Sequence, residues 1–123
     1  MRGFMTARDV YEIALALIDE EGSDNEPGYA AKAPRLIDSL QREIAFYEGV
    51  APTSVTDLDD DLSISGDSAV RIMPYGLAAL FALADRNADM QGDYSFMYRS
   101  LLRTIRPEES DVEDEYGALD GMR

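Results

Sequence analysis

The residues whose spacing could do chemistry are three aspartates at alternate positions, Asp57, Asp59 and Asp61. Calcium-binding loops place oxygen ligands at this spacing, followed by a glycine at the sixth position and a bidentate glutamate at the twelfth. Here the sixth position is Leu62 and the twelfth is Ser68. Because the turn residue and the main ligand are both missing, the pattern predicts a solvated acidic loop and no metal site.

Paired carboxylates occur at two other places, where they could serve acid-base or magnesium chemistry. One group ends the first predicted helix and the other lies in the second, and the members are Asp19, Glu20, Glu21, Asp38 and Glu43. Each carboxylate falls on the polar side of its helix pattern. The sequence has no histidine, no cysteine and no glycine-rich phosphate loop that could complete a site. We therefore expect no enzymatic activity, no catalytic residue and no cofactor.

A cluster of aromatic and basic residues could stack on bases and contact phosphates. It comprises Tyr94, Phe96, Tyr98, Arg99, Arg103 and Arg106. The net charge of the chain is −14, however, and affinity for nucleic acid depends on an excess of Lys and Arg. The tyrosines also fit the apolar stripe of a helix. The sequence thus favours a subunit contact for the arginines and disfavours sequence-specific binding of nucleic acid.

No apolar run after Pro74 reaches the roughly 20 residues that a membrane-spanning helix needs, because it ends at Asp85 and Arg86. The first residues, Met1 to Met5, contain one arginine and no apolar segment typical of a secretory leader. We expect a soluble protein without membrane attachment. Either Met1 or Met5 could be its natural start.

Two amphipathic helices are predicted in the first half of the chain. Thr6 is placed as a helix cap, and apolar residues then recur at helical spacing up to a helix end near Gly22. Residues 23–28 read SDNEPG, which is typical of a turn. A second apolar stripe runs from Ala33 to Tyr47, and Pro34 is expected in or near the first turn of that helix.

A long connection is predicted from Gly49 to Gly66. It contains few apolar residues and an acidic cluster that consists of Asp57, Asp59, Asp60 and Asp61. The possible anchors to the core are Val55, Leu58, Leu62 and Ile64. The connection should therefore lie on the surface and make short contacts with the core.

The most apolar stretch, from Val70 to Asn87, predicts the central helix of the core. Proline inside a helix costs roughly 3 kcal/mol, so Pro74 should open this helix after a short helical turn capped at Asp67 or Ser68. The central helix should be buried nearly all round. Gly76 in its first turn would let another backbone approach closely.

A last helix is predicted from about Met90 to Ile105, with the arginines beside or opposite its apolar face. From Glu108 onward, seven acidic residues face only Arg123, and such a block of like charge favours an extended tail. The sequence therefore predicts an all-α domain over residues 1–106 and an acidic tail over residues 107–123. The domain should have four main helices in a small bundle, with a long loop between helices two and three.

The order of these elements resembles the small all-helical head-tail connector, or adaptor, proteins of tailed bacteriophages and prophages. The likeness covers roughly residues 6–106. It rests on the helix order and on the segments TARDVYEIALALI, APRLIDSLQREIA, TDLDDDLSIS, MPYGLAALFALADRN and FMYRSLLRTI.

The resemblance implies a homo-oligomeric ring below the phage portal protein that extends the DNA channel and offers a surface to tail components. It implies no catalytic residues, and a location in the virion or, during assembly, in the bacterial cytoplasm. In this family the C-terminal segment often contacts the portal or neighbouring subunits, which is a role for residues 107–123. A closed ring needs two different complementary faces. The candidates are Arg99, Arg103 and Arg106 for one face and Asp57, Asp59, Asp60 and Asp61 for the other.

Two other interpretations fit the composition. An acidic protein can mimic DNA and occupy a basic protein surface, which requires carboxylates along one elongated face and a stable monomer or dimer. A small metal-dependent hydrolase requires several acidic side chains that converge in one pocket. The clustering of acidic residues in one loop and one tail favours the connector over the mimic.

Overall fold

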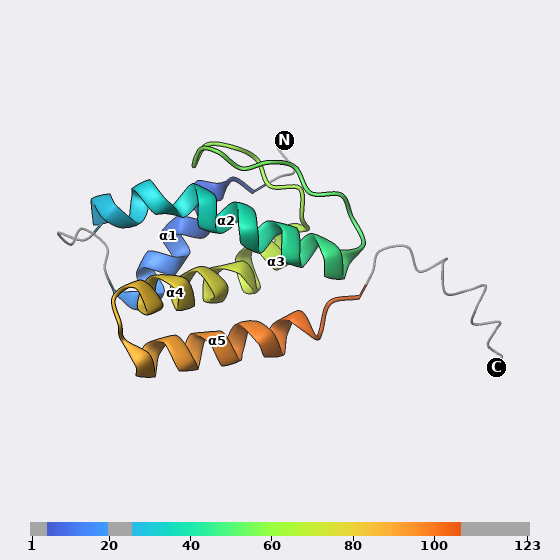
Figure 1. Ribbon diagram of the computed structural model, residues 1–123. Helices are drawn as coiled ribbons and strands as arrows, with labels where there is room; N and C mark the ends of the chain where they lie inside the picture. The colour runs from blue at the N-terminus through green and yellow to red at the C-terminus, as the bar shows by residue number, and fades with distance from the viewer. Residues whose placement is uncertain (1–4, 20–25, 107–123) are drawn as a thin grey trace, which may run out of the picture.

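A computed structural model of the protein describes residues 5–19 and 26–106 (Figure 1). These residues form α1 (Ala7–Ile18), α2 (Glu26–Glu48), α3 (Gly66–Arg71), α4 (Met73–Ala84) and α5 (Ala88–Leu102). Within the described residues, β-type pairing is confined to an isolated bridge between Thr6 and Asp61. The predicted all-α fold, with four long helices and a long loop after the second, is confirmed. The predicted acidic tail lies outside the described residues.

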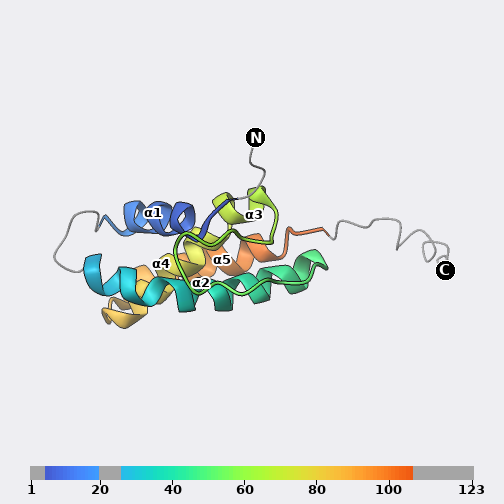
Figure 2. The same cartoon turned by 90° about the horizontal axis from the view of Figure 1, so that it is seen from above.

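The helix α4 lies in the middle of the fold and contacts α1, α2, α3 and α5. Figure 1 shows α2 above α4 and α5 below it. Seen from above, α1 and α2 lie on the two sides of the upper layer, and α4 runs beneath them (Figure 2). The connection between α2 and α3 crosses the outside of this upper layer, so it lies on the surface as predicted.

The first helix forms where the sequence predicts it. The Thr6 side chain accepts a hydrogen bond from the Asp9 N–H (3.3 Å), and Asp9 Oδ2 accepts one from the Thr6 N–H (2.9 Å). This reciprocal pair satisfies amide groups that the start of a helix leaves without partners. The helix ends at Ile18, where Asp19 adopts a left-handed backbone (φ 58°). The helix therefore ends four residues before the predicted end near Gly22, because the left-handed residue Asp19 stops it.

The second helix begins at Glu26 and has Pro34 in its interior, so the prediction of a proline in the first turn is wrong. Tertiary contacts hold the turns that precede the proline. The Tyr29 ring stacks on the Phe81 ring with centroids 4.5 Å apart, and the Tyr11 hydroxyl donates to the Glu26 carbonyl (3.1 Å). These contacts offset the roughly 3 kcal/mol that an interior proline costs.

The break between α3 and α4 falls where the sequence places it. The two helices are separated by Ile72, so Pro74 lies in the first turn of α4, where its missing N–H breaks no helical hydrogen bond. The cap of α3 differs from the prediction. Ser65 is the N-cap and its hydroxyl accepts from the Ser68 N–H (3.1 Å), whereas Asp67 and Ser68 lie inside the helix.

The central position of α4 is as predicted, but its burial is not uniform. Leu77 and Phe81 have no exposed surface, whereas Leu80 is half-buried and Leu83 is 58% exposed. Residues 73–82 of α4 are buried or half-buried, whereas its last two residues, Leu83 and Ala84, are exposed. Burial nearly all round therefore holds only for the first turns of this helix.

The stretch Gly66–Ala84, which combines α3 and α4, has the length and apolar composition of a membrane-spanning helix. Its most apolar window is 61% buried inside the fold. The central helix of a hydrophobic core passes the same test, and the contacts of α4 with the other described helices account for its composition.

Gly76 permits a very close approach between helices. A Cβ atom at this position would lie 2.8 Å from two ring carbons of Tyr98 and 2.9 Å from Cδ2 of Leu40. The neighbour is an aromatic ring of α5, so the prediction of another backbone at Gly76 is wrong. The ring cannot easily move aside, because Tyr98 is buried and its hydroxyl donates to Glu43 Oε1 (2.7 Å).

The last helix begins and ends slightly before its predicted limits. Asn87 caps it by accepting a hydrogen bond from the Met90 N–H (3.1 Å), so that α5 starts at Ala88. It ends at Leu102, and Ile105 lies beyond it. The apolar face of the helix packs against α4, as its sequence pattern predicts.

We expect Gly76→Ala to destabilise the protein by about 1–3 kcal/mol, because the added methyl group must displace the Tyr98 ring or the Leu40 side chain. The matched control is Gly28→Ala in the first turn of α2, where an added Cβ meets nothing within 4 Å. Alanine there should raise the free energy of unfolding by up to about 1 kcal/mol. Urea unfolding followed by circular dichroism measures both, and equal stabilities would contradict the packing role of Gly76.

Candidate functional site

The acidic loop caps the start of α1. The Ala7 N–H donates to the Asp60 carbonyl (2.9 Å), and the Arg8 N–H donates to the Leu58 carbonyl (2.7 Å). Both amides belong to the first turn of α1, whose N–H groups have no partners within the helix. The loop therefore supplies acceptors that the helix lacks, and its carboxylates lie near the positive end of the helix dipole.

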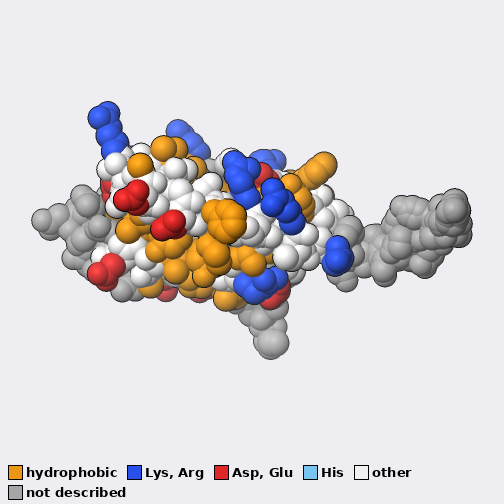
Figure 3. Space-filling view, turned by 90° about the horizontal axis from the view of Figure 1, so that it is seen from below, with side chains coloured by type: hydrophobic (Ala, Val, Ile, Leu, Met, Phe, Trp, Pro, Cys, Tyr) orange, Lys and Arg blue, Asp and Glu red, His pale blue; other side chains and the backbone are white. Residues whose placement is uncertain are grey.

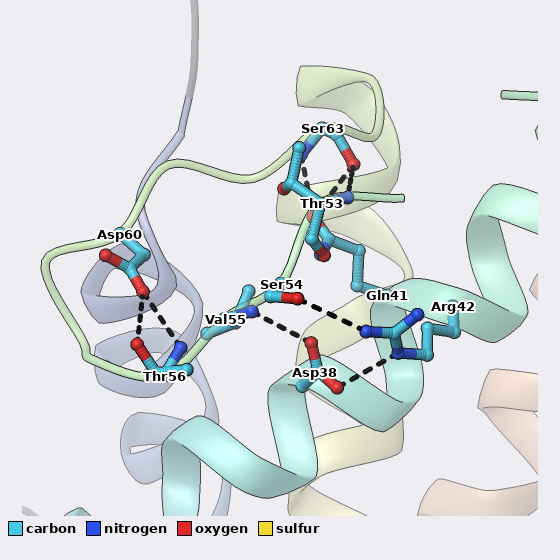
Figure 4. Close-up of polar contacts among 9 residues, drawn as sticks. All are labelled: Asp38, Gln41, Arg42, Thr53, Ser54, Val55, Thr56, Asp60 and Ser63. Atoms are coloured by element: carbon cyan, nitrogen blue, oxygen red, sulfur yellow. Dashed lines mark hydrogen bonds and ion pairs between the residues drawn. The ribbon is translucent and has the colours of Figure 1, made fainter. Parts of the chain in front are cut away.

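Asp60 holds the turn of this loop together (Figure 4). Its Oδ2 accepts hydrogen bonds from the Thr56 N–H (2.8 Å), the Thr56 hydroxyl (3.2 Å) and the Asp57 N–H (3.1 Å). The bond from the Thr56 N–H is the main cause that lowers the pKa of Asp60. Asp57 Oδ1 in turn accepts from the Asp59 N–H (2.8 Å). Two of the predicted interface aspartates thus shape the loop itself.

The other two aspartates link the loop to the N-terminal end of α1. Asp59 Oδ1 lies 2.9 Å from Arg8 Nη2, in an exposed ion pair, and Asp61 forms the isolated bridge with Thr6. Among residues 5–19 and 26–106, no group of three or more acidic side chains is placed to hold a metal ion. The structure therefore brings the four aspartates together in one loop, in which they have structural contacts.

Gln41 joins both arms of the loop to α2 (Figure 4). This side chain is fully buried; its Nε2 donates to the Thr53 carbonyl (2.7 Å), and its Oε1 accepts from the Ser63 N–H (2.7 Å) and hydroxyl (3.2 Å). The Thr53 N–H also donates to Ser63 Oγ (3.1 Å). One buried amide thus fixes two loop segments that are ten residues apart.

Asp38 holds the middle of the loop against α2 (Figure 4). Its Oδ1 accepts from the Val55 N–H (2.8 Å), and its Oδ2 accepts from Arg42 Nε (3.0 Å). The bond from the Val55 N–H is the largest cause that lowers the pKa of Asp38. Glu43 accepts instead from the Tyr98 hydroxyl, so the structure does not bring Asp38 and Glu43 into one site.

Glu48 connects the end of α2 to the start of α3. Its carboxylate is buried and accepts from the Ser65 N–H (3.0 Å), the Ser65 hydroxyl (2.7 Å) and the Ser68 hydroxyl (2.5 Å). The sequence interpretation did not include this group or Gln41. A signal was present, because Gln41 and Glu48 each follow a buried isoleucine by four residues and so fall on the buried stripe of α2.

An open groove of about 660 Å³ lies between α2 and the loop. Its lining includes Lys32, Arg35, Asp38, Val55 and Thr56. The carboxylate of Asp38 is already bonded to the loop, and Lys32 and Arg35 are exposed cations. The groove therefore offers charge at its rim but no set of nucleophile, base and stabilising group.

The arginines predicted for the interface lie on the exposed side of α5 and just beyond its end. Arg99 and Arg103 are four residues apart, hence on one helical face, and Arg106 follows the helix. Among the described residues, ion pairs to carboxylates are made by Arg8, Arg42 and Arg71, and not by these three. A basic strip thus lies on the surface of an acidic protein.

The aromatic residues near these arginines point in different directions. Tyr94 donates to the Leu17 carbonyl (2.5 Å) and Tyr98 to Glu43, and burial raises the pKa of both hydroxyl groups. Phe96 points outward and is 71% exposed. The three aromatics therefore do not form one stacking platform for bases. Figure 3 shows apolar side chains over the middle of this face and basic side chains towards the end of α5.

The acidic loop and the outer side of α5 lie on opposite sides of the molecule (Figure 1). The loop rests on α1 and α2, and α4 separates these helices from α5. The predicted acidic group and the predicted basic group are thus each assembled, but they are kept apart within one subunit. Comparison with protein families, curated proteins and solved structures finds no match for this chain.

We expect Gln41→Met to leave the helices folded and to loosen the loop, because methionine fills a similar volume without bonding to Thr53 and Ser63. The lost bonds should lower the free energy of unfolding by about 1–3 kcal/mol. Hydrogen exchange measured by mass spectrometry should be faster in residues 53–63. The control Arg71→Met removes an exposed ion pair with Asp67 in α3, away from the Gln41 contacts, that is worth at most about 1 kcal/mol. Equal exchange in the two variants would show that Gln41 does not hold the loop.

Acid should release the loop, because hydrogen bonds lower the pKa of Asp38 and Asp60 below their ordinary value of 3.8. A carboxyl group with a lowered pKa stabilises the folded state above its unfolded-state pKa, and the stabilisation is lost as the pH falls through the folded-state value. We expect loop contacts to be unchanged between pH 7 and 5, and to weaken below about pH 4. NMR shifts of the Thr56 and Val55 amides measure this, and shifts that stay constant down to pH 2 would contradict it.

Proposed function

We propose that this protein is a structural assembly subunit, a head-tail connector of a tailed bacteriophage or prophage that forms a ring below the portal protein. The observation that supports this proposal is that a group of arginines towards the end of α5 and the acidic loop lie on opposite sides of the molecule (Figure 1). Arg99 and Arg103 lie on one side, and the Asp57 to Asp61 loop lies on the other. A face that complements a different face of the next copy generates a ring when the rotation closes.

Both surfaces are pre-organised for such a contact. The loop is fixed to α1 by backbone hydrogen bonds and to α2 by Asp38, Gln41 and Glu48. Arg99 lies in α5 and Arg103 is the residue that caps its end, and the position of this helix is set by the Tyr98 contact with Gly76. Since little backbone must become ordered on binding, the entropy cost of the contact is small.

The use of polar groups favours assembly over catalysis. The buried or half-buried side chains of Asp38, Gln41 and Glu48 all bond to the loop, and Glu43 bonds to Tyr98. A catalytic site needs a nucleophile, a base and a stabilising group in one cleft. In the described part of the chain these polar groups are instead spread along α2, where they hold structure.

The net charge of −14 suits a ring that DNA crosses. A negative wall repels phosphate groups, so DNA would pass without being bound. In this proposal the ring extends the DNA channel, its partners are the portal protein and tail components, and its subunits occur in the virion or, before assembly, in the bacterial cytoplasm. It requires no cofactor, membrane or specific DNA sequence.

An acidic DNA mimic is the alternative function. It needs a row of accessible carboxylates along one elongated face. In the structure Asp60 is bonded within its own loop, Asp59 pairs with Arg8, and α5 presents Arg99 and Arg103 to solvent. This distribution supports the mimic less well than the connector.

Light scattering across a concentration series, with negative-stain images, tests the proposal, and portal protein can be added as a template. We expect closed rings for the native chain. Arg99→Glu with Arg103→Glu should leave the monomer folded and weaken ring formation at least about tenfold. Reversal of the loop charges by Asp59→Arg with Asp61→Arg, which keeps the Asp57 and Asp60 bonds that shape the loop, should restore rings in the same chain.

The matched control is Lys32→Glu with Arg35→Glu, which makes the same change in net charge on α2. This control should retain rings. If both double variants weaken ring formation equally, the cause is the change in net charge, and α5 is not part of the contact. A chain that forms no ring with or without portal protein, and that binds basic host proteins, would favour the acidic mimic.

A further inference from the structure

The outer face of α5 has a charge pattern that is symmetric about Phe96. Asp93 and Arg99 are each three residues from Phe96, and Asp89 and Arg103 are each seven residues from it. Spacings of three and four residues place all five on one side of the helix, and all five are exposed. Figure 3 shows the same order on the surface, with acidic side chains near the start of α5, apolar ones in the middle and basic ones near its end.

We propose that the free subunit forms a two-fold symmetric dimer, in which α5 packs antiparallel to α5 of a second copy with the two Phe96 rings at the centre. In such a pair, residues at equal distance from Phe96 face each other. Asp93 then meets Arg99 of the second copy, and Asp89 meets Arg103. Each pair occurs twice, because a two-fold contact uses the same patch on both subunits.

Charge complementarity identifies the occupant of this face as a second copy. An antiparallel pairing sets every aspartate of the stripe against an arginine, whereas a parallel pairing sets like charges against each other. Phe96 is 71% exposed and Met97 is 37% exposed, and both would lose solvent contact at the centre of the pair. Interfaces commonly place aromatic and methionine side chains at the core and charges at the rim.

The backbone also allows a close approach. Gly92 and Ser100 are each four residues from Phe96, so that these two small residues face each other across the pair. An added Cβ at Gly92 meets nothing within 4 Å, which shows that space is open on this side of the helix. The paired segment is roughly 22 Å long. Its area is smaller than a standard interface, and we expect a dissociation constant in roughly the micromolar range.

The helix dipole accounts for only part of this arrangement. Acidic residues in the first turn and basic residues in the last turn stabilise a single helix, whichever way they point. The dipole effect falls off within those turns, so it gives a reason for Asp89 and Arg99 but none for Asp93, which lies near the middle of α5. It also gives no reason for an exposed phenylalanine between them.

This dimer goes beyond the proposed connector role and does not depend on it. Arg99 and Arg103 take part in both contacts, so a subunit can make one of them at a time. If both proposals hold, the dimer is the form of the free protein and must dissociate before the acidic loop of another subunit can bind α5.

Disulfide crosslinking tests the register directly, because the chain has no cysteine. Gly92→Cys and Ser100→Cys are purified separately, mixed and mildly oxidised. We expect a covalent heterodimer from the mixture and little product from either variant alone, because position 92 faces position 100 and not itself. The control mixes Gly92→Cys with Phe46→Cys, whose position on α2 is 82% exposed. A yield no higher than in this control would overturn the proposal.

Charge reversal tests the pairing by sedimentation equilibrium. We expect Asp93→Arg or Arg99→Asp alone to lower the association constant at least about tenfold, and the two together to restore it to within about threefold. The matched control combines Asp93→Arg with Arg103→Asp, which changes the same charges but leaves the pairs mismatched. Circular dichroism of the dilute proteins reports any loss of helix. Equal association by the two double variants would overturn the pairing.

The two proposals fail separately. If ring formation is lost and is then restored by charge reversal at Asp59 and Asp61, the result concerns the connector contact. If Arg99→Asp abolishes the dimer and charge reversal at Asp93 restores it, the result concerns the contact between two α5 helices. A protein that stays monomeric up to about millimolar concentration, and gives no specific crosslink, would overturn the dimer whatever happens with the portal protein.

Discussion

The contact of the Tyr98 ring with Gly76 fixes where α5 lies, and both proposed contacts depend on that position. A side-chain atom at Gly76 would overlap the ring, so α5 can pack at this distance only on a helix with glycine at that place. The hydroxyl of the same tyrosine reaches Glu43, which connects α5 to α2 as well as to α4. With its inner face held in this way, the helix presents Phe96 and the charged residues on either side of it outward. The interaction that completes the core therefore also defines the surface that remains available to a partner.

A second constraint is that a long loop must satisfy its backbone polar groups without strands or helices of its own. Here the loop does so by serving other elements. Its carbonyls cap the first turn of α1, Ser65 caps α3, and buried polar side chains of α2 bond to its amides and carbonyls. The aspartates of the loop, whose spacing matches part of a calcium site, and Asp38 on α2 take part in these contacts. Their main effect is to hold an acidic surface in one conformation.

Local signals predicted those parts of the fold that local interactions determine. The Thr6 cap, the break at Pro74 and the apolar stripes depend on residues within one or two turns, and the structure confirms them. The sequence placed the start of α2 too close to Pro34. The helix begins earlier because the stacking of Tyr29 on Phe81 holds helical turns that Pro34 would otherwise weaken. At Gly76 the sequence predicted a close backbone, and the structure has a side-chain ring there. The residue pattern of one helix does not reveal which atoms of another helix will approach it. Gln41 and Glu48 could have been noticed as polar residues on a buried stripe, but their partners come from a loop with no periodicity.

The candidate surfaces divide in the same manner. That Arg99 and Arg103 share a helix face follows from their spacing, and so does the symmetric order of charges about Phe96. That this face is exposed while Tyr94 and Tyr98 are not depends on how α5 is rotated against α4, which requires the structure. In the observed rotation, the buried contacts that stabilise the fold lie on one side of α5, and the exposed arginines lie on the other. Substitutions on the outer side can therefore change association while the fold is kept, because they remove no buried contact. The inner side allows no such separation, since Tyr98 contributes both to the core and to the orientation of the arginines.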